Sequence, residues 1–297
     1  MCANVIYIRK NNLGSKFELP LVKYLYSHKL AYLNHQDNHF VIATHLDHIV
    51  GVGVIYTNDF HPSNHYFYIH VSTMFQRQGI ASKLLKYVEC MQCVDRLQCL
   101  INAKNIVAND FLLKHQFYLV RKTFDIEVIE VSSESMMYET KKLNELNVDE
   151  FNQFKTIFYS NYFKYHESVN PLNLKFDQNT FFESVKETLD LDQSIVLIGS
   201  QFDTAYLGAD GVLAYMLFGD SDHKSVELAY LGGQSESEID YYCGFFSYVM
   251  GMFLKQYSKL YFESDSTDFY MTSLVKYLKI QPSQQYNTYI KKLSVLE

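Results

Sequence analysis

The sequence has no tryptophan, only four arginines and four prolines among its 297 residues, and five cysteines. Its 26 basic and 33 acidic residues give a formal net charge of −7. Binding to duplex nucleic acid needs clustered cations, so this composition argues against a nucleic-acid partner. The most apolar stretch, residues 241–254, is interrupted by glycine and serine. It is also shorter than the roughly 20 residues that a bilayer requires, so we expect no membrane span.

The cysteines form no framework that is typical of disulfide-bonded proteins. Cys90 and Cys93 make a C-x-x-C pair, but no second pair and no nearby histidine pair completes a zinc site. We therefore expect reduced thiols and no bound metal. The first residues show no basic stretch followed by an apolar run, so we expect no secretory signal and a cytoplasmic protein.

The composition is that of a globular protein, with 48% apolar and 20% charged residues. Its length is about twice that of a typical domain. Up to residue 131 the periodicity predicts a strand, one or two helical segments, three strands, a helix, a strand, a short helix and a long strand. This order is typical of a mixed α/β (α+β) layer built on one sheet.

The polar run 132–135 is the best candidate for a linker, because the pattern starts again after it. Gly53 in the first half corresponds to Gly211 in the second, and Asn105 corresponds to Asp268 at a similar offset. We interpret the chain as two copies of one fold, in residues 1–131 and 136–297. The alternative is that any two α/β units share such spacings.

The segment 66–85 is the most informative part of the sequence. A predicted strand ends at Val71, and after a short loop Gly79 opens an amphipathic helix. The first turn of a helix has backbone N–H groups without partners and attracts anions. Gly79 permits close approach to the backbone, Arg77 adds a cation, and no acidic residue lies between His65 and Lys86. The pattern favours a phosphate site over an ordinary strand-to-helix turn.

These residues resemble the signature of the GNAT N-acetyltransferase superfamily, which is Arg or Gln, two residues, Gly, one residue, and Gly or Ala. Here it reads Gln76-x-x-Gly79-x-Ala81, preceded by the strand pattern Ile69-His70-Val71. A second pattern of the family begins at Asn105 and runs to Phe117. The resemblance covers residues 4–131 well, and residues 136–297 only by the order of elements. It implies two tandem GNAT-like domains.

The resemblance implies that acetyl-coenzyme A binds the first half as a cosubstrate. Backbone groups of the fourth strand would pair with pantetheine, and one N–H would polarise the thioester carbonyl. Amides of the turn would hold the pyrophosphate, and Asn105 would contact the pantetheine arm. The implied cofactor-binding residues are Ile69, Val71, Gln76, Arg77, Gln78, Gly79, Ile80, Ala81, Ser82 and Asn105.

The implied reaction is direct attack of an amine on the thioester, for which the amine must first lose a proton. His65 occupies the position where many members of the family have a glutamate, and is our candidate base. The alternative is a solvated loop histidine. Many members have a tyrosine as the acid where this chain has Leu112. Tyr118 is close in sequence and is our candidate, although strand alternation need not aim it inward. Water is the alternative acid.

The second half lacks the phosphate turn. Aligning Leu231 with Val71 places three carboxylates, Glu236, Glu238 and Asp240, where the cationic turn stands in the first half. These would repel a pyrophosphate, so we interpret this half as a degenerate copy with an acceptor-site or structural role. Tyr162, His166 and Glu167 are candidate acceptor-binding residues. The alternative for them is an amphipathic helix end that Pro171 stops.

The sequence therefore predicts a bacterial N-acetyltransferase that acts on an amine of a small molecule or peptide, as a monomer or homodimer. A non-catalytic module that binds acyl-coenzyme A is the alternative, because Tyr is missing at position 112 and Glu at position 65.

Overall fold

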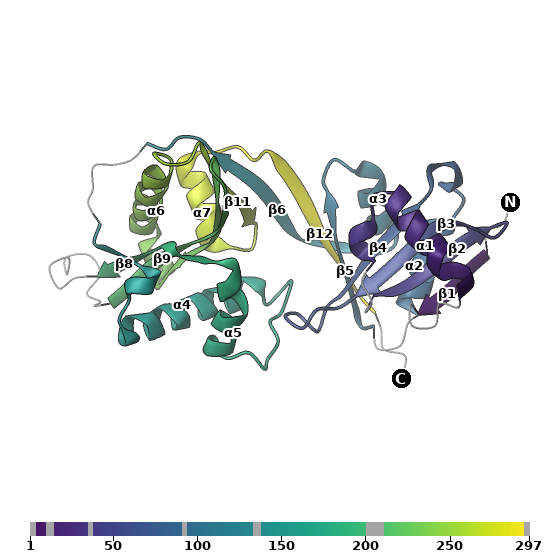
Figure 1. The fold of residues 1–297 in the computed structure, drawn as a ribbon, viewed down its shortest axis with the longest axis horizontal. Helices are drawn as coiled ribbons and strands as arrows, with labels where there is room; N and C mark the ends of the chain where they lie inside the picture. The colour runs from purple at the N-terminus through teal and green to yellow at the C-terminus, as the bar shows by residue number, and fades with distance from the viewer. Residues whose placement is uncertain are drawn as a thin grey trace. The chain divides into compact units, whose positions relative to one another are not determined.

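The computed structural model describes residues 4–9, 15–34, 38–90, 94–132, 138–199 and 211–293. The chain forms two compact units, whose elements are labelled in Figure 1. The first unit comprises residues 1–100, 108–118 and 288–297. The second comprises residues 101–107 and 119–287. Each unit has its own core of buried apolar side chains.

The first unit is built on a mixed sheet. Strands β1 to β4 follow one another in antiparallel pairs, and β5 lies parallel to β4. The last residues of β12 lie on the other side of β5. In order across the sheet the strands are β1 (Asn4–Arg9), β2 (His39–His45), β3 (His48–Tyr56), β4 (His65–Val71), β5 (Arg96–Asn102) and β12 (Gln284–Lys292).

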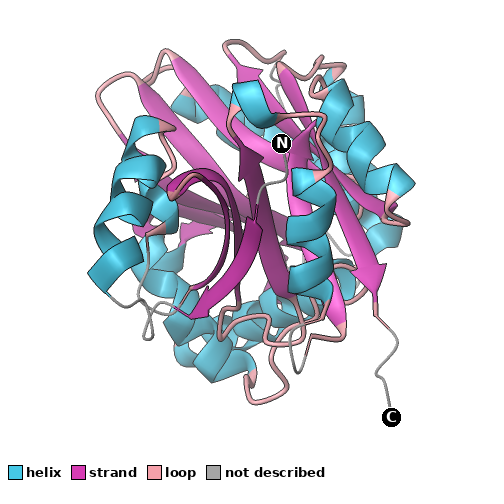
Figure 2. Cartoon of the chain, turned by 90° about the vertical axis from the view of Figure 1, so that its right-hand side faces the viewer, coloured by secondary structure: helices cyan, strands magenta, loops and turns pink. Residues whose placement is uncertain are grey.

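Helices cover both faces of this sheet (Figure 2). Helix α1 (Ser15–Ser27) and the short η2 (Ala31–Leu33) pack on one face, against apolar side chains of β2 and β3 such as Phe40 and Val52. Helix α2 (Ile80–Glu89) packs on the opposite face, over Gly51 and Gly53. A Cβ atom at Gly51 would lie 3.3 Å from both Ile80 and Leu84, so the glycine allows α2 to approach the sheet closely. The remaining helices are η3 (Thr73–Phe75) and α3 (Ile106–Lys114).

The second unit repeats this plan. Its strands lie in the order β12, β6 (Tyr118–Val128), β11 (Lys259–Asp265), β10 (Ser225–Gly233), β9 (Gly211–Ser221), β8 (Asp190–Gly199) and β7 (Thr140–Lys142). Its helices are η4 (Leu143–Glu145), α4 (Val148–His166), α5 (Gln178–Val185), η5 (Lys186–Thr188), η6 (Glu236–Glu238), α6 (Ile239–Phe253) and α7 (Phe269–Leu278). Strand β10 pairs in parallel with β11 and antiparallel with β9, as β4 pairs with β5 and β3.

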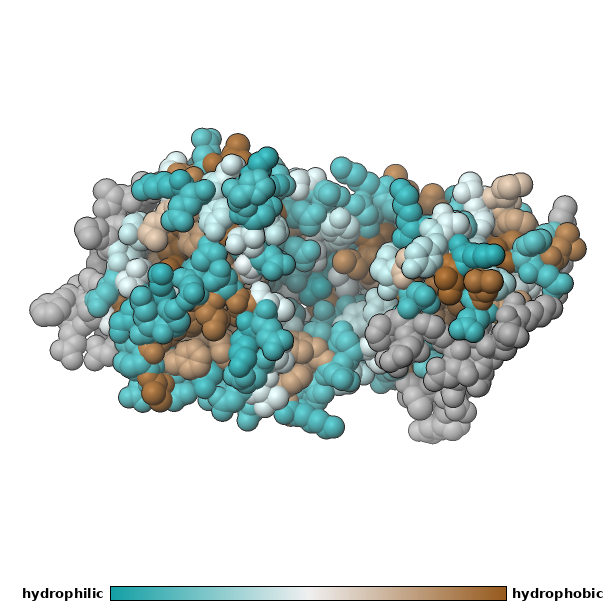
Figure 3. Space-filling view, viewed as in Figure 1, coloured by the Kyte–Doolittle hydropathy of each residue, from teal (hydrophilic) through white to brown (hydrophobic). Residues whose placement is uncertain are grey.

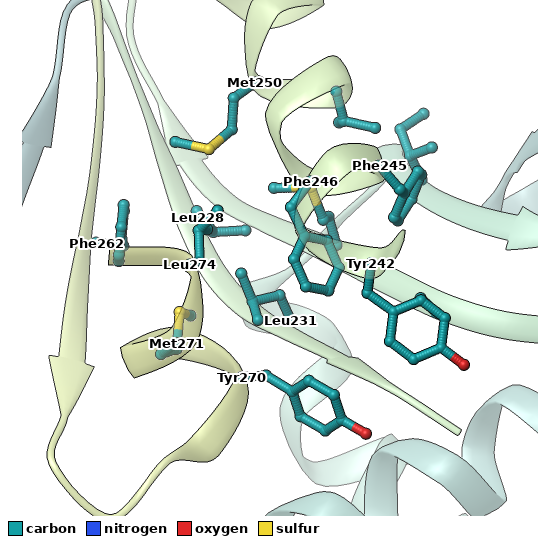
Figure 4. Packing of buried hydrophobic residues seen from close by; sticks show 14 of the residues in the cluster. Leu228, Leu231, Tyr242, Phe245, Phe246, Met250, Phe262, Tyr270, Met271 and Leu274 are labelled. Atoms are coloured by element: carbon teal, nitrogen blue, oxygen red, sulfur yellow. The ribbon is translucent and has the colours of Figure 1, made fainter. Parts of the chain in front are cut away.

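Aromatic side chains dominate the core of the second unit. Helices α6 and α7 pack on the strands through side chains such as Phe246, Met250 and Leu274 (Figure 4). Helices α4 and α5 contribute Phe158 and Phe181, whose ring centroids lie 5.0 Å apart. Burial of these large side chains supplies most of the stabilisation that a unit of this size needs.

The prediction of an α/β fold with two copies of one element order is confirmed. Elements β1 to β6 and β7 to β12 carry helices in corresponding places. The helix predicted from Gly79 begins at Ile80, and the strand predicted from Tyr66 begins at His65. Part of the predicted linker, residues 133–135, lies outside the described residues.

The compact units differ from a division of the chain at residues 131 and 136. Residues 119–128 of β6 belong to the second unit, where β6 pairs antiparallel with β11. Residues 288–292 of β12 belong to the first unit. There Tyr289 Oη donates to Asn109 Oδ1 at 2.9 Å, and Lys291 Nζ lies 2.7 Å from Glu89 Oε1. Each unit therefore contains a strand segment from the other half of the sequence.

This exchange predicts that a residue near the end of the chain stabilises the first unit. Tyr289 is 4% exposed, so Tyr289→Ala should leave a cavity and destabilise the first unit by about 3–5 kcal/mol, as for other large-to-small aromatic changes. Hydrogen exchange of β4 and β5 amides should then become faster. The control is Lys292→Ala, an exposed residue of the same strand. Unchanged exchange in Tyr289→Ala would contradict the assignment of β12 to the first unit.

Candidate active site

Strands β4 and β5 are paired at one end only. They pair at His65 with Leu97 and at Tyr66 with Gln98, and no further pairing occurs along the described lengths of the two strands. On its other side β4 stays paired with β3 as far as Val71. The backbone groups of β4 that face β5 beyond Tyr66 are therefore not used by the sheet. Ile69 and Val71 lie on this stretch, which can pair with an extended ligand as a further strand would.

The turn after β4 presents the N-terminus of a helix to solvent. Helix α2 begins at Ile80, and its N-cap residue, Gly79, has φ 76° and gives no side-chain cap to the described first turn. A Cβ atom at Gly79 would meet nothing within 4 Å, so the space in front of the turn is open. The first turn of α2 contains no acidic residue. Free N–H groups and the helix dipole make this turn suitable for a phosphate group.

Two glutamine side chains brace the turn. Gln76 Nε2 donates to Val71 O at 3.0 Å, and Gln78 Nε2 donates to Met74 O at 3.2 Å. Arg77 is exposed and adopts a left-handed conformation, with φ 60°. With the amide groups of the glutamines engaged inside the turn, the backbone N–H groups and the Arg77 guanidinium are the groups best placed to meet an anion.

The remaining predicted cofactor residues differ in their surroundings. Ile80 is buried in the core and Ala81 is half-buried, so they shape the helix start with their backbone. Ser82 Oγ lies 2.9 Å from Nε2 of His115, whose pKa is lowered by burial. Asn105 lies in the segment 101–107, which belongs to the second unit, and its contact with pantetheine stays a prediction.

The first unit also has a polar aromatic face that was not predicted from the sequence. Side chains alternate along β4, so that Tyr66, Tyr68 and His70 lie on the face that α1 covers, opposite α2. Tyr66 stacks on Tyr56 of β3, with ring centroids 5.5 Å apart. His70 contacts Tyr24 of α1. We call this the α1 face. The period-two run of aromatic residues at 66, 68 and 70 was the signal in the sequence that could have revealed it.

The two predicted catalytic residues lie near the paired end of β4. His65 begins the strand, and its Nδ1 is 4.0 Å from Asp95 Oδ1. Burial lowers the pKa of His65, while Asp95 opposes this effect. Tyr118 is 45% exposed and interacts electrostatically with Arg96, which also interacts with Tyr66. Tyr118 and His65 are therefore both close to the start of β5, and their catalytic roles stay predictions.

In the second unit the corresponding strand diverges in the same way, and side chains hydrogen-bond to its end. Strand β10 pairs with β11 only from Ser225 to Glu227 in the described strands. At the far end of β10, Gly233 O accepts hydrogen bonds from Tyr270 Oη at 2.8 Å and from Asn161 Nδ2 at 3.1 Å. Figure 4 shows the Tyr270 ring beside Leu231, with its hydroxyl at the edge of the apolar cluster. These contacts occupy the carbonyl group of the last residue of β10.

The turn after β10 is acidic, as the sequence indicates. Glu236 Oε1 lies 2.7 Å from both Lys164 Nζ and Tyr165 Oη. The N–H group of Ser237 is satisfied by the Ser235 hydroxyl, at 3.3 Å. The acidic turn therefore binds side chains of α4, and its charge opposes a phosphate ligand.

The predicted acceptor residues lie at the end of α4 in the second unit. Tyr162 is 9% exposed and stacks on His166, with ring centroids 3.9 Å apart. His166 Nδ1 is 2.9 Å from Tyr162 O, one turn back, and Glu167 is the exposed C-cap residue. The pair packs beside Phe181 of α5, as an ordinary helix end does. A role in acceptor binding stays a prediction.

Within the described residues there is no group of three or more His, Cys, Asp or Glu side chains placed to hold a metal ion. No described helix is long and apolar enough to cross a membrane. On the face seen in Figure 3, hydrophobic residues lie scattered among hydrophilic ones.

Comparison with known proteins agrees with this geometry. Residues 14–129 match the family model described as an acetyltransferase (GNAT) domain. This range contains β4, the turn and α2. No curated protein sequence matches the chain.

Solved structures extend the likeness to the whole chain. A GCN5-related N-acetyltransferase from Sphaerobacter thermophilus is 10% identical, with a TM-score of 0.60, over 98% of this chain and 96% of that protein. A tandem GNAT protein from the clavulanic acid biosynthesis pathway is 7% identical, with a TM-score of 0.54, over all of both chains. At such low sequence identities, the similarity to these structures shows a shared fold only.

The geometry of the turn after β4 predicts that the affinity for coenzyme A depends on the positive charge of Arg77. Arg77→Gln removes the exposed cation and should weaken binding about tenfold at low salt, because a charge beside a diphosphate contributes about 1–2 kcal/mol. The loss should shrink as salt screens the interaction. Calorimetry at two salt concentrations measures both effects. The control is Lys86→Gln, in the last turn of the same helix. Equal affinities of the two variants would contradict a phosphate site in this turn.

A second prediction concerns Asp268, the N-cap residue of α7, which accepts a hydrogen bond from Met271 N at 3.0 Å. Burial raises its pKa from 3.8 to about 7. Between these values the folded state retains a proton that the unfolded state loses, so stability from this group falls as the pH rises from 4 to 7. Asp268→Asn keeps the acceptor oxygen and removes the charge. Its melting temperature should therefore exceed that of the wild type at pH 8, with a smaller dependence on pH.

The matched control for this prediction is Asp177→Asn, at the N-cap of α5. Hydrogen bonds from the backbone and side chain of Thr180 lower the pKa of Asp177, so this variant should gain no stability at pH 8. If Asp268→Asn and the wild type melt alike from pH 5 to pH 8, Asp268 does not titrate in this range.

Proposed function

We propose that this protein, which has the tandem GNAT fold, is an acetyl-coenzyme A-dependent N-acetyltransferase that acts on an amine of a small molecule or peptide. The observation that carries the proposal is the combination of a free strand edge and an open phosphate turn at the same end of β4. A ligand that pairs with the strand edge and also binds the turn needs an extended arm joined to a phosphate group. Coenzyme A has both, as pantetheine and pyrophosphate. The match of residues 14–129 to an acetyltransferase domain supports the same conclusion.

In this proposal the first unit holds the cosubstrate. The backbone of Ile69 and Val71 would pair with pantetheine, and an N–H of this stretch would polarise the thioester carbonyl. The turn from Gln76 to Ser82 would hold the pyrophosphate, chiefly through backbone N–H groups and Arg77. The degenerate second unit would complete the acceptor site or act structurally, with Tyr162, His166 and Glu167 as its candidate contacts.

The reaction is direct attack of the amine nitrogen on the thioester carbon. An alkyl ammonium with a pKa of about 10.4 must first lose a proton, which costs about 4.6 kcal/mol at pH 7. His65 is the base that the sequence predicts, and Tyr118 is the candidate acid for the departing thiolate. A base with a pKa near or below neutral is unprotonated at pH 7 and therefore able to take a proton.

The alternative function is a non-catalytic module that binds acyl-coenzyme A. The two proposals differ in thiol release. Acetyl-coenzyme A is mixed with polyamines, amino acids and aminoglycosides, and free thiol is measured for each. The proposed enzyme releases thiol with at least one class of amine. Tight binding of coenzyme A without release on any amine favours the module.

The role of His65 is tested by His65→Gln, which keeps a polar side chain of similar size and cannot take a proton at neutral pH. If His65 is the base, turnover falls about tenfold, at the low end of general acid–base catalysis, with little change in affinity for acetyl-coenzyme A. The control is His48→Gln, an exposed histidine at the start of β3. Equal turnover of the two variants would remove His65 from the mechanism.

A further inference from the structure

A hydrogen-bonded cluster on the α1 face lies next to the free edge of β4. Tyr24 Oη is 2.9 Å from His70 Nδ1, and it accepts a hydrogen bond from Ser72 Oγ at 3.1 Å. The rings of Tyr24 and His70 meet edge to face, with centroids 5.7 Å apart. His28 stacks on Tyr24 and lies 4.6 Å from His70, measured between ring centroids. Tyr24, which Ser72 also contacts, and His28 thus fix the position of the His70 imidazole.

The position of this imidazole along β4 matters for the proposed reaction. His70 lies between Ile69 and Val71, on the part of β4 that does not pair with β5. The α2 face at this point is filled by apolar side chains such as Ile80 and Leu84. The α1 face carries hydroxyl and imidazole groups instead. An amine approaching a thioester held at this edge would find a proton acceptor on the α1 face.

The surroundings keep the His70 imidazole neutral near pH 7. Burial lowers its pKa, and the neighbouring His28 lowers it further, because two adjacent imidazoles resist a second positive charge. Tyr24 and His28 face it from α1, and Tyr68 lies two residues before it on the same face. The residue of β3 that pairs with it, Val52, carries no charge.

Building on the proposed function, we propose that His70 is the catalytic base that takes the proton of the acceptor amine, with Tyr24 as its positioning residue. In the tautomer with hydrogen on Nδ1, His70 donates to Tyr24 Oη, and Nε2 is the acceptor. Nε2 takes one proton from the ammonium, the nitrogen lone pair forms the C–N bond, and the C–S bond breaks. The imidazolium returns its proton to the thiolate, and the second ammonium proton goes to solvent.

This role differs from the one that the sequence predicts for His65. Along the strand, His65 lies about 13 Å from Ile69, at 3.3 Å per residue. By alternation its side chain belongs with Phe67 and Ile69 on the α2 face. Its Nδ1 lies 4.0 Å from Asp95 Oδ1, near the paired end of β4. His70 is therefore the histidine of β4 that can act at the thioester directly.

The experiment compares His70→Gln with the exposed-histidine control His48→Gln. We expect kcat to fall about 100-fold in His70→Gln, within the range for loss of a general base, with the Kd of coenzyme A unchanged. In the wild type, kcat/KM should fall as the pH drops below 6.5, because His70 becomes protonated; we call this fall the acidic limb. The acidic limb should be absent in the variant. The unchanged Kd shows that the variant folds.

A second variant tests the positioning role. Tyr24→Phe keeps the ring against His28 and removes the hydroxyl that accepts from His70 Nδ1. Without this acceptor the imidazolium is less stable, so the acidic limb of kcat/KM should move to lower pH, with a smaller loss of kcat than in His70→Gln. An acidic limb that stays at the wild-type pH would overturn the role of Tyr24.

The results of these experiments distinguish the role of His70 from the transferase activity itself. If the wild type releases thiol with an amine, and His70→Gln matches His48→Gln in kcat and pH profile, the role of His70 is overturned and the transferase stands. If His65→Gln alone removes the acidic limb, the base is His65. If the wild type binds coenzyme A but releases no thiol with any amine, both the transferase and the role of His70 fail.

Discussion

The divergence of two parallel strands is the constraint on which the candidate site depends. Hydrogen bonds hold β4 to β5 at His65 and Tyr66, and β4 then continues to Val71 with β3 as its only described partner. An unpaired edge inside a sheet costs free energy unless something binds it. The Gln76 amide fixes the end of β4 through Val71 O, and α2 starts from that anchored turn. The free edge, the phosphate turn and His70 are thereby brought to one end of one strand.

The second unit shows the same divergence with a different outcome. Strands β10 and β11 part after Glu227, but Tyr270 and Asn161 hydrogen-bond to the end of β10 at Gly233. In the acidic turn that follows, Glu236 pairs with Lys164. The corresponding turns of the two units therefore carry charges of opposite sign. The order and direction of the paired strands agree in the two units, whereas the side chains of the turn and of the neighbouring helices differ.

The two units exchange strand segments. Residues 119–128 complete the sheet of the second unit, and residues 288–292 complete that of the first. The contacts of Tyr289 and Lys291 show that the last strand is packed into the first unit. Periodicity predicted both strands but not their partners, because an apolar alternating strand fits either sheet edge equally well.

The sequence by itself determined the α/β class, the repeated order of elements and the glycine-containing turn that opens α2. These follow from local rules: periodicity sets the elements, and Gly79 with Arg77 defines the turn within a few residues. The tertiary structure alone decided where β4 and β5 part, which unit each last strand joins, and that Tyr24, His28 and His70 form one cluster. These features join residues distant in sequence, such as 24 and 70, and such contacts depend on the packing of whole elements, which no local pattern encodes.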